Sequence, residues 1–262
     1  MNKKVLLYVN NTKEAAFPLS NKVKRALISN GYEIVSNITD KADIVIGFGG
    51  DGTLISWLNA TNYLANSKYI GVNCGTLGFL QDFDVLDVKK FVDNIKNYIE
   101  EYLNFADITV SIDNNEFTYN ALNEFVVKRS DDKALRVSVK IEEALLENYV
   151  GTGIIFSTPT GSTARNLSSG GSIICPGINC IQMNPIEPNR FLGALQSSII
   201  VPKEYSIALF SNSNEEIKIL SDGEEVYSGK FDKLKIELSD KKLIKLVDKQ
   251  VNFIEKVRQK LI

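Results

Sequence analysis

Residues 44–53 read Ile44-Val45-Ile46-Gly47-Phe48-Gly49-Gly50-Asp51-Gly52-Thr53, an apolar run that passes directly into a turn rich in glycine. The apolar run predicts a buried strand, and the residues that follow the turn predict a helix that starts near Leu54. Strand, glycine turn and helix in this order present backbone N–H groups to a phosphate. Glycine also allows close approach, because it has no Cβ. The stretch therefore predicts a phosphate-binding turn.

Asp51 is the unusual residue of this turn, because phosphates repel a carboxylate unless it serves a metal or takes a proton. Three glycines surround it at the carboxyl end of a buried strand, where open α/β sheets bind their ligands. This context favours a functional site over an ordinary tight turn. We therefore predict phosphate chemistry with an acidic catalytic group.

The sequence on both sides of the turn alternates between strand and helix patterns up to about residue 103. Strands are predicted at 4–9, 32–35, 43–48 and 69–73, and helices at 19–30, 56–64 and 88–101. This alternation predicts an α/β domain with an open, mostly parallel sheet and helices on both faces. The chain has no Gly-Lys-Ser/Thr phosphate loop and no Gly-x-Gly-x-x-Gly after its first strand, which excludes two common nucleotide-binding fingerprints.

From residue 104 the pattern changes to short strands separated by polar turns, which indicates a β-rich, sandwich-like domain. Ten strands are predicted there, at 108–112, 117–121, 125–128, 137–141, 153–157, 198–201, 206–210, 217–220, 225–228 and 233–238, followed by an eleventh at 243–247. Residues 252–261 form a predicted helix that returns to the first domain. We therefore predict an α/β domain at 1–103, completed by 248–262, and a β-rich domain at 104–247. Two domains also suit a chain of 262 residues.

Composition excludes several classes of protein. The formal net charge is −2, so the whole chain gives no case for nucleic acid or membrane binding. No apolar run reaches the roughly 18 residues that span a bilayer, and the N-terminal apolar stretch is too short for a signal peptide. Cys74, Cys175 and Cys180 form no Cys-x-x-Cys pair, which favours a reduced, cytoplasmic protein.

The chain contains no histidine. Catalysis by Ser-His-Asp or Cys-His groups, histidine-ligated metals and histidine general bases are all excluded. Any acid–base step must therefore fall to Asp, Glu, Lys, Tyr or Cys, which strengthens the prediction for Asp51.

Three further segments carry candidate binding residues. Gly75-Thr76-Leu77-Gly78-Phe79-Leu80 follows the predicted strand at 69–73, at the same edge of the sheet as Asp51. Asn123-Glu124 places two polar residues inside an apolar strand pattern, where one of them must face a core or a cleft, although the local pattern alone favours a bulge or an edge position. Residues 151–164 run from a strand into a loop of small hydroxyl residues, which suits a nucleoside or polyol ligand.

The order and spacing of these segments resemble those of bacterial NAD kinases over residues 49–171. The resemblance implies an α/β N-terminal domain, a β-rich NAD-binding C-terminal domain, and transfer of the γ-phosphoryl group of ATP to the 2′-hydroxyl of the adenosine ribose of NAD. It implies that Asp51 is the general base, that Mg²⁺ or another divalent cation arrives with ATP and has few dedicated protein ligands, and that the chain forms a homodimer or homotetramer. The residues that it places against NAD and ATP are Gly49, Gly50, Gly52, Thr53, Asn73, Phe79, Asn123, Glu124, Thr152, Thr160, Ser162, Thr163, Ala164, Arg165, Asn166 and Ser168.

The chain departs from the pattern of that family at three places. Thr152 stands where the family has the Asp of Gly-Asp-Gly, Arg165 replaces a Tyr, and a common His is absent from residues 184–191. Two alternatives stay open beside NAD kinase activity: a lipid or sugar kinase of the same superfamily, and a weakly catalytic regulator that binds NAD or NADP. The donor, ATP or polyphosphate, also stays open.

Overall fold

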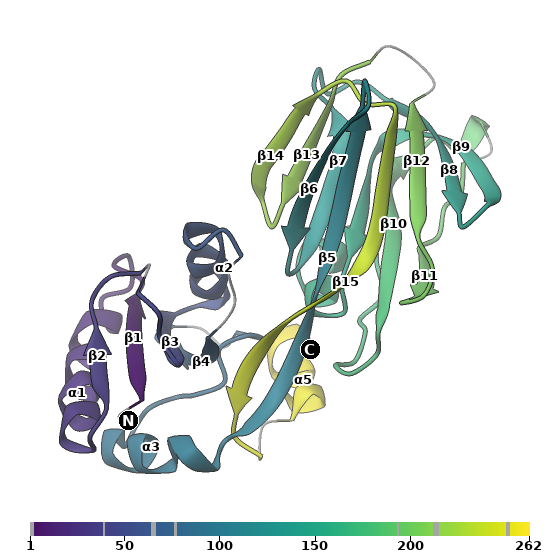
Figure 1. Cartoon of the computed structure of the whole chain (residues 1–262). Coiled ribbons are helices and arrows are strands. Elements are labelled where there is room, and N and C mark those ends of the chain that lie inside the picture. The colour runs from purple at the N-terminus through teal and green to yellow at the C-terminus, as the bar shows by residue number, and fades with distance from the viewer. Residues whose placement is uncertain are drawn as a thin grey trace. The chain divides into compact units, whose positions relative to one another are not determined.

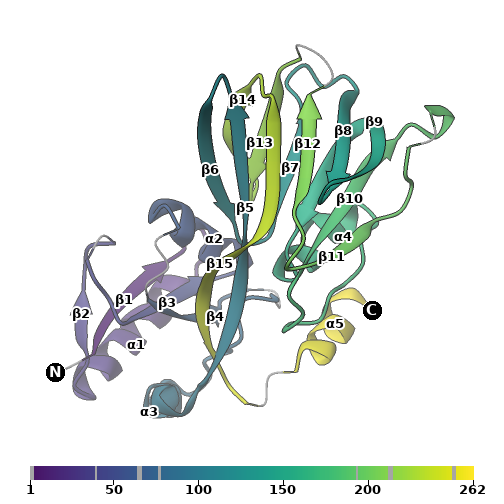
Figure 2. The same ribbon diagram turned by 45° about the vertical axis from the view of Figure 1, so that its right-hand side comes forward.

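The structure is a computed structural model that describes residues 3–38, 40–63, 67–75, 78–192, 194–211, 215–249 and 252–262. The chain divides into two compact units, one of residues 1–103 with 242–262 and one of residues 104–241. Both division points lie inside strands, β5 (Ile99–Ile112) and β15 (Lys233–Val247). These two strands pair with each other and run side by side in both views (Figures 1 and 2).

The first unit is built on a parallel sheet. Its strand order is β15–β4–β3–β1–β2, where only the end of β15 takes part. The other strands are β1 (Lys4–Val9), β2 (Glu33–Val35), β3 (Ile44–Gly49) and β4 (Lys68–Asn73). Every residue of β3 is buried, because this strand lies between β1 and β4 with both faces covered.

Helices cover this sheet. They are α1 (Ala16–Ser29), α2 (Asp51–Ala60) and α3 (Val88–Asn94) with the 3₁₀ turn Ile95–Asn97, whereas α5 (Phe253–Leu261) contacts the segment 79–82 that follows β4. Alternate residues of β3 share one apolar core with α1 and α3. On the opposite face of the sheet, Trp57 of α2 stacks on Tyr69 of β4 with ring centroids 5.6 Å apart.

The second unit consists of antiparallel strands. One path runs β14–β13–β7–β9–β8–β12–β15, while β10 pairs with β9 and β11, and β5 pairs with β6. The new strands are β6 (Asn115–Ala121), β7 (Glu124–Arg129), β8 (Leu135–Ile141), β9 (Ala144–Ser157), β10 (Cys180–Pro188), β11 (Ile199–Pro202), β12 (Ile207–Ser211), β13 (Ile217–Ser221) and β14 (Glu224–Gly229). Their inward side chains form one apolar core. The predicted fold class, α/β followed by β-rich, is confirmed.

Several predicted boundaries are wrong. The helix predicted at 88–101 ends at Asn97, and β5 starts at Ile99; the predicted strands at 233–238 and 243–247 are one strand, β15. The contacts group 242–247 with the first unit, because Lys245 of β15 pairs with Tyr69 of β4. Leu64, at the end of the helix predicted at 56–64, lies outside the described residues.

Strand β10 was not predicted, because Pro185 and Pro188 interrupt its pattern. Strand β11 pairs with β10 only as far as Met183, so beyond that residue β10 has a strand neighbour on one side, β9. An edge tolerates proline, since no partner strand needs the missing N–H. Among the described residues no helix is long and apolar enough to cross a lipid bilayer.

Candidate active site

The glycine turn joins β3 to α2 in the first unit. Strand β3 ends at Gly49, Gly50 is extended with φ −112° and ψ −172°, and α2 begins at Asp51. The predicted helix start near Leu54 is therefore three residues late. Asp51 lies in the first turn of α2, where the free N–H groups and the helix dipole favour a negative charge.

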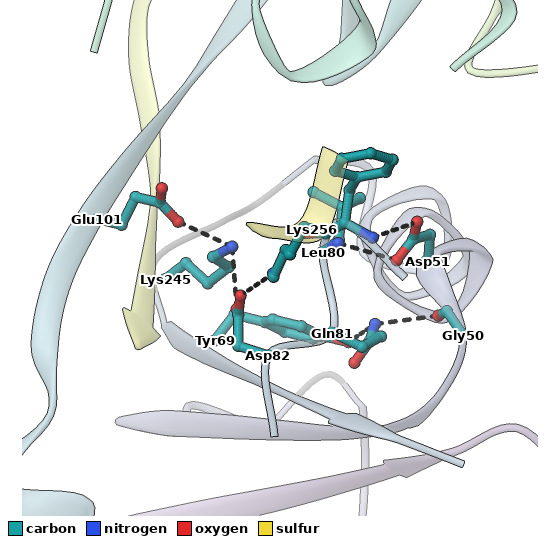
Figure 3. Close-up of polar contacts among 10 residues, drawn as sticks. Gly50, Asp51, Tyr69, Leu80, Gln81, Asp82, Glu101, Lys245 and Lys256 are labelled. Carbon is teal, nitrogen blue, oxygen red and sulfur yellow. Dashed lines mark hydrogen bonds and ion pairs between the residues drawn. The ribbon is translucent and has the colours of Figure 1, made fainter. Parts of the chain in front are cut away.

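The Asp51 carboxylate is held in place by the segment that follows β4. Its Oδ2 accepts a hydrogen bond from the Phe79 N–H at 2.9 Å, and its Oδ1 accepts one from the Leu80 N–H at 2.9 Å (Figure 3). Lys260 of α5 lies 3.3 Å from Oδ2. The carboxylate is thus fixed at both oxygens, and its side chain remains 31% exposed.

The glycines around Asp51 fall into two groups. A Cβ on Gly49 would lie 2.1 Å from Thr53 Oγ1, and one on Gly78 would lie 2.1 Å from Asp51 Oδ1, so close packing requires both. A Cβ on Gly50 or Gly52 would meet nothing within 4 Å, and neither residue has a positive φ. Neither packing nor backbone conformation explains these two glycines, which points to the approach of a ligand.

Residues 78–82 are anchored beneath the turn. The Gln81 amide donates to the Gly50 carbonyl at 3.0 Å and to the Tyr69 hydroxyl at 3.2 Å (Figure 3). Burial raises the pKa of Tyr69, so this hydroxyl stays protonated. Thr76 and Leu77, in the glycine-rich segment singled out above, lie outside the described residues.

A buried ion cluster fixes the end of this segment. Asp82 lies 3.0 Å from Lys245 of β15 and also pairs with Lys256 of α5, and Lys245 lies 2.8 Å from Glu101 (Figure 3). Burial lowers the pKa of Lys245, but the two carboxylates outweigh burial and raise it above its ordinary value. Two positive and two negative charges thus neutralise each other below the Asp51 site.

The other predicted residues of the first unit have structural neighbours. Asn73 shapes the loop after β4, because its side chain bonds the backbone of Gly75 and donates to Asp84 at 3.0 Å. Thr53 is 1% exposed and its hydroxyl has no hydrogen-bond partner within the described chain. The Phe79 ring is buried, 5.9 Å from the Phe253 ring of α5 between centroids.

In the second unit, Asn123 lies in the junction between β6, which ends at Ala121, and β7, and Glu124 is the first residue of β7. Asp222 holds this junction. Its carboxylate accepts hydrogen bonds from the N–H groups of Leu122, Asn123 and Glu124 at 2.8, 2.7 and 3.1 Å. Asp222 has a positive φ in the turn of the β13–β14 hairpin.

The hydroxyl-rich loop lies against the same junction. Thr158 donates its hydroxyl to the Leu122 carbonyl at 2.6 Å, and its N–H donates to the Asn123 carbonyl at 2.9 Å. A Cβ on Gly161 would lie 2.0 Å from the Asn123 carbonyl oxygen. The structure therefore brings Asn123, Glu124 and the loop at 158–164 together, although 34 residues separate Glu124 from Thr158.

Two of the predicted loop residues already form side-chain hydrogen bonds within the protein. Ser162 accepts from the Ile174 N–H at 3.0 Å, and Asn166 donates to Gln182. Thr160, Thr163 and Ala164 are half-buried, whereas Thr152, Arg165 and Ser168 are exposed. Thr152 donates its hydroxyl to Glu187 at 2.7 Å.

Glu124 is a titratable group at this junction whose pKa is strongly raised. Burial and, next, the Asp222 carboxylate raise its pKa to about 7, and Arg165 lowers it. Its Oε2 is buried without a hydrogen-bond partner among the described residues. A buried carboxylate oxygen without a partner is costly, so a ligand hydroxyl at this point would be favourable.

Sequence reasoning missed Asp82, Asp222, Lys245, Lys256 and Lys260. The Asp222-Gly223 pair indicates a hairpin turn, and Lys260 is typical of the last turn of a helix. Neither pattern predicts which residue the side chain contacts in the folded chain. Their roles come from contacts with residues about 100 to 209 positions away.

Comparison with known proteins identifies the family. Residues 31–102 match the ATP-NAD kinase N-terminal domain, and residues 122–248 match the ATP-NAD kinase C-terminal domain. The NAD kinase of Finegoldia magna is 31% identical over 257 residues, which cover 94% of this chain and 93% of that protein. This chain belongs to the ATP-NAD kinase family. The NAD kinase of Streptococcus gordonii is 34% identical over 233 residues, covering 86% of this chain and 85% of the relative.

Two solved structures share the fold of this family member. Yeast NADH kinase, crystallised with NADH, superposes with a TM-score of 0.85 at 19% identity, covering 99% of this chain and 87% of the yeast chain. An NAD kinase from Archaeoglobus fulgidus in complex with ATP gives a TM-score of 0.74 at 23% identity, covering 98% and 99%. The resemblance inferred from the motifs is confirmed.

Proposed function

We propose that this chain transfers the γ-phosphoryl group of ATP to the 2′-hydroxyl of the adenosine ribose of NAD, which yields NADP. The observation that carries the proposal is the Asp51 carboxylate, fixed at the first turn of α2 beside the open positions of Gly50 and Gly52. Backbone N–H groups at a helix start receive phosphate, and the neighbouring carboxylate receives a proton.

Asp51 acts on the attacking hydroxyl. Its Oδ2 accepts hydrogen bonds from the Phe79 N–H and from Lys260, whereas Oδ1 accepts one backbone hydrogen bond and keeps a lone pair for the substrate. The 2′-oxygen bonds to the γ-phosphorus, the bond from that phosphorus to the bridging oxygen breaks, and ADP leaves. The proton of the hydroxyl passes to Asp51. Because phosphoryl transfer has a loose transition state, orienting the hydroxyl matters more than strong basicity.

A divalent cation such as Mg²⁺ belongs to this proposal as a companion of ATP. Among the described residues no group of three or more Cys, Asp or Glu could hold a metal ion. We therefore assign the ligands of this cation mainly to the phosphate oxygens of ATP and to water, with few carboxylates from the protein. When bound, the cation neutralises charge on the phosphates.

The junction in the second unit suits the adenosine part of NAD. We assign the unpartnered Glu124 Oε2 to a ribose hydroxyl and Asn123 to the same nucleoside. Thr163, Ala164 and Ser168 on the adjoining loop complete the adenosine contacts, and Arg165 and Thr152, both exposed, are assigned to the nicotinamide half.

A cytoplasmic location and assembly into a homodimer or homotetramer complete the proposal. Fully exposed Phe191 and largely exposed Leu192, both in the second unit, support self-association. Light scattering coupled to gel filtration measures the assembly directly, and a monomer at micromolar concentration would contradict it.

The experiment that tests the function compares wild type with Asp51→Asn. Wild type, ATP, Mg²⁺ and NAD should yield NADP, followed with an NADP-specific dehydrogenase. The variant should lose about a thousandfold in kcat, because it cannot take the proton, while calorimetry finds NAD affinity nearly unchanged. Asp93→Asn, at an exposed position of α3, is the matched control.

Each other outcome contradicts a stated part of the proposal. Near-normal turnover by Asp51→Asn would exclude Asp51 as the base. Wild type that binds NAD without turnover would be a regulator. Wild type that phosphorylates a lipid or sugar and spares NAD would be a different kinase.

A further inference from the structure

The last helix of the chain reaches the Asp51 site. Lys260 in α5 places its Nζ 3.3 Å from Asp51 Oδ2 and 4.7 Å from the centroid of the Phe79 ring. Asp51 has no other salt bridge within the described part of the chain. The lysine is 34% exposed, so its ammonium faces both the carboxylate and solvent.

Helix α5 is anchored, which fixes the location of Lys260. One turn earlier, buried Lys256 donates to the Phe79 carbonyl at 2.9 Å and pairs with Asp82. Phe253 contacts the Phe79 ring from the same helix. Residues four apart share a helix face, so anchoring Lys256 also directs Lys260 toward Asp51. Lys260 is therefore not a randomly oriented surface lysine.

The negative charge that a phosphoryl donor and Asp51 bring together calls for a positively charged side chain at this point. A phosphoryl donor brings several negative charges next to Asp51, which is itself negative, and repulsion would oppose binding. The N–H groups at the start of α2 contribute partial positive charge only. Lys260 is the full positive charge that the described structure places against this carboxylate.

We propose that Lys260 supplies the positive charge that offsets the phosphates of the nucleotide at Asp51. This inference rests on the proposed function, because it takes the Asp51 turn as the site of a nucleoside triphosphate. With the pair intact, the local charge is zero; without Lys260, the nucleotide meets an uncompensated carboxylate. The role thus predicts how affinity follows the summed charge of the two side chains.

The test measures binding of Mg²⁺ with adenylyl imidodiphosphate, a triphosphate analogue that is not turned over, by calorimetry. Lys260→Gln should weaken binding about tenfold, whereas Lys260→Arg should stay within about threefold of wild type. Asp51→Asn should bind more tightly than wild type. The double variant Asp51→Asn with Lys260→Gln restores a local charge of zero and should return to near wild-type affinity.

Two controls separate charge from structure. Arg258→Gln removes a charge from the same helix, where Arg258 pairs with Glu255, and should leave binding unchanged. The Lys260→Gln loss should be small for AMP and shrink at high salt, because it comes from charge. A loss equal for AMP and the triphosphate analogue, or a double variant as weak as Lys260→Gln, would show a structural role and overturn the proposal. So would unchanged binding by Lys260→Gln.

The two proposals fail differently. Wild type that binds the analogue yet makes no NADP contradicts the proposed function, while the charge series still decides the role of Lys260. Wild type that binds no nucleotide overturns both.

Discussion

Single residues at the glycine turn separate packing from ligand binding. Gly49 and Gly78 are required because a side chain would collide with Thr53 or Asp51, whereas Gly50 and Gly52 face open space. A methyl group therefore has opposite consequences at positions only a few residues apart.

Gly52→Ala tests this difference. Because Gly52 lies in α2 with open space around it, alanine should raise the free energy of unfolding by about 0.5–1 kcal/mol. Nucleotide affinity should fall about tenfold or more, because the methyl group occupies the approach of the phosphate. Chemical denaturation and calorimetry on the same sample measure both. Gly78→Ala should instead destabilise the fold, and a Gly52→Ala protein with full nucleotide affinity would contradict the phosphate-binding assignment.

Glu124 makes stability depend on pH. Its pKa is raised to about 7 in the folded protein, from 4.5 for an ordinary glutamate. Between these values the folded state binds more protons than the unfolded state, so stability falls as pH rises from about 4.5 to 7. Glu124→Gln should remove this penalty and stabilise the protein at pH 8 by up to about 3 kcal/mol, with little effect at pH 4. Denaturation at both pH values checks it, and a gain equal at both would contradict it.

At the scale of elements, two carboxylates perform the same task in different units. Asp51 accepts two successive N–H groups from the segment after β4, and Asp222 accepts three from the β6–β7 junction. All of these N–H groups except that of Glu124 belong to residues outside the strands, so a charged acceptor satisfies them in place of a ladder partner. In the proposed function Asp51 combines this work with the role of general base, while Asp222 holds Asn123 and Glu124.

The ion cluster below the first site should be costly to break. Asp82→Asn removes the shared partner of Lys245 and Lys256 and leaves buried positive charge uncompensated. We expect a loss of about 3–5 kcal/mol in the free energy of unfolding. Asp93→Asn, an exposed change in α3, serves as control and should leave stability within about 0.5 kcal/mol of wild type. A loss from Asp82→Asn as small as that of the control would show that the cluster does not stabilise this unit.

At the scale of the whole molecule, the two units differ in how the chain builds them. The second unit is one continuous stretch, residues 104–241, whereas the first needs 1–103 together with 242–262. The returning segment supplies the parallel neighbour of β4 and the lysines of the ion cluster.

Fragments test this organisation. Residues 104–241 should fold alone and unfold cooperatively, because they contain their own apolar core. Residues 1–103 alone should fail to do so, and adding the segment 242–262 as a separate peptide should restore part of the structure. Circular dichroism during thermal unfolding measures each case. A cooperative transition from 1–103 alone would contradict the need for the returning segment.

The glycine turn, the alternation before residue 103 and the hairpins after it were predictable from sequence, because they depend on local periodicity and turn chemistry. Asp51 and the loop at 158–164 were likewise predictable as candidate site segments, since their residue types are unusual for the elements that carry them. Asn123-Glu124 became a candidate only through the resemblance, because the two residues by themselves favour a bulge or an edge. Strand β10 was not, because its prolines fit only an edge that pairing creates.

The sequence by itself determined the kind of chemistry that we propose, since a carboxylate among glycines typical of a phosphate-binding turn, in a chain without histidine, leaves few other bases. Only the tertiary structure decided what surrounds that carboxylate. The N–H groups of Phe79 and Leu80 lie 28 and 29 residues from Asp51, and Lys260 lies 209 residues away. Contacts at such separations depend on how strands and helices pack, and no local pattern encodes the partner.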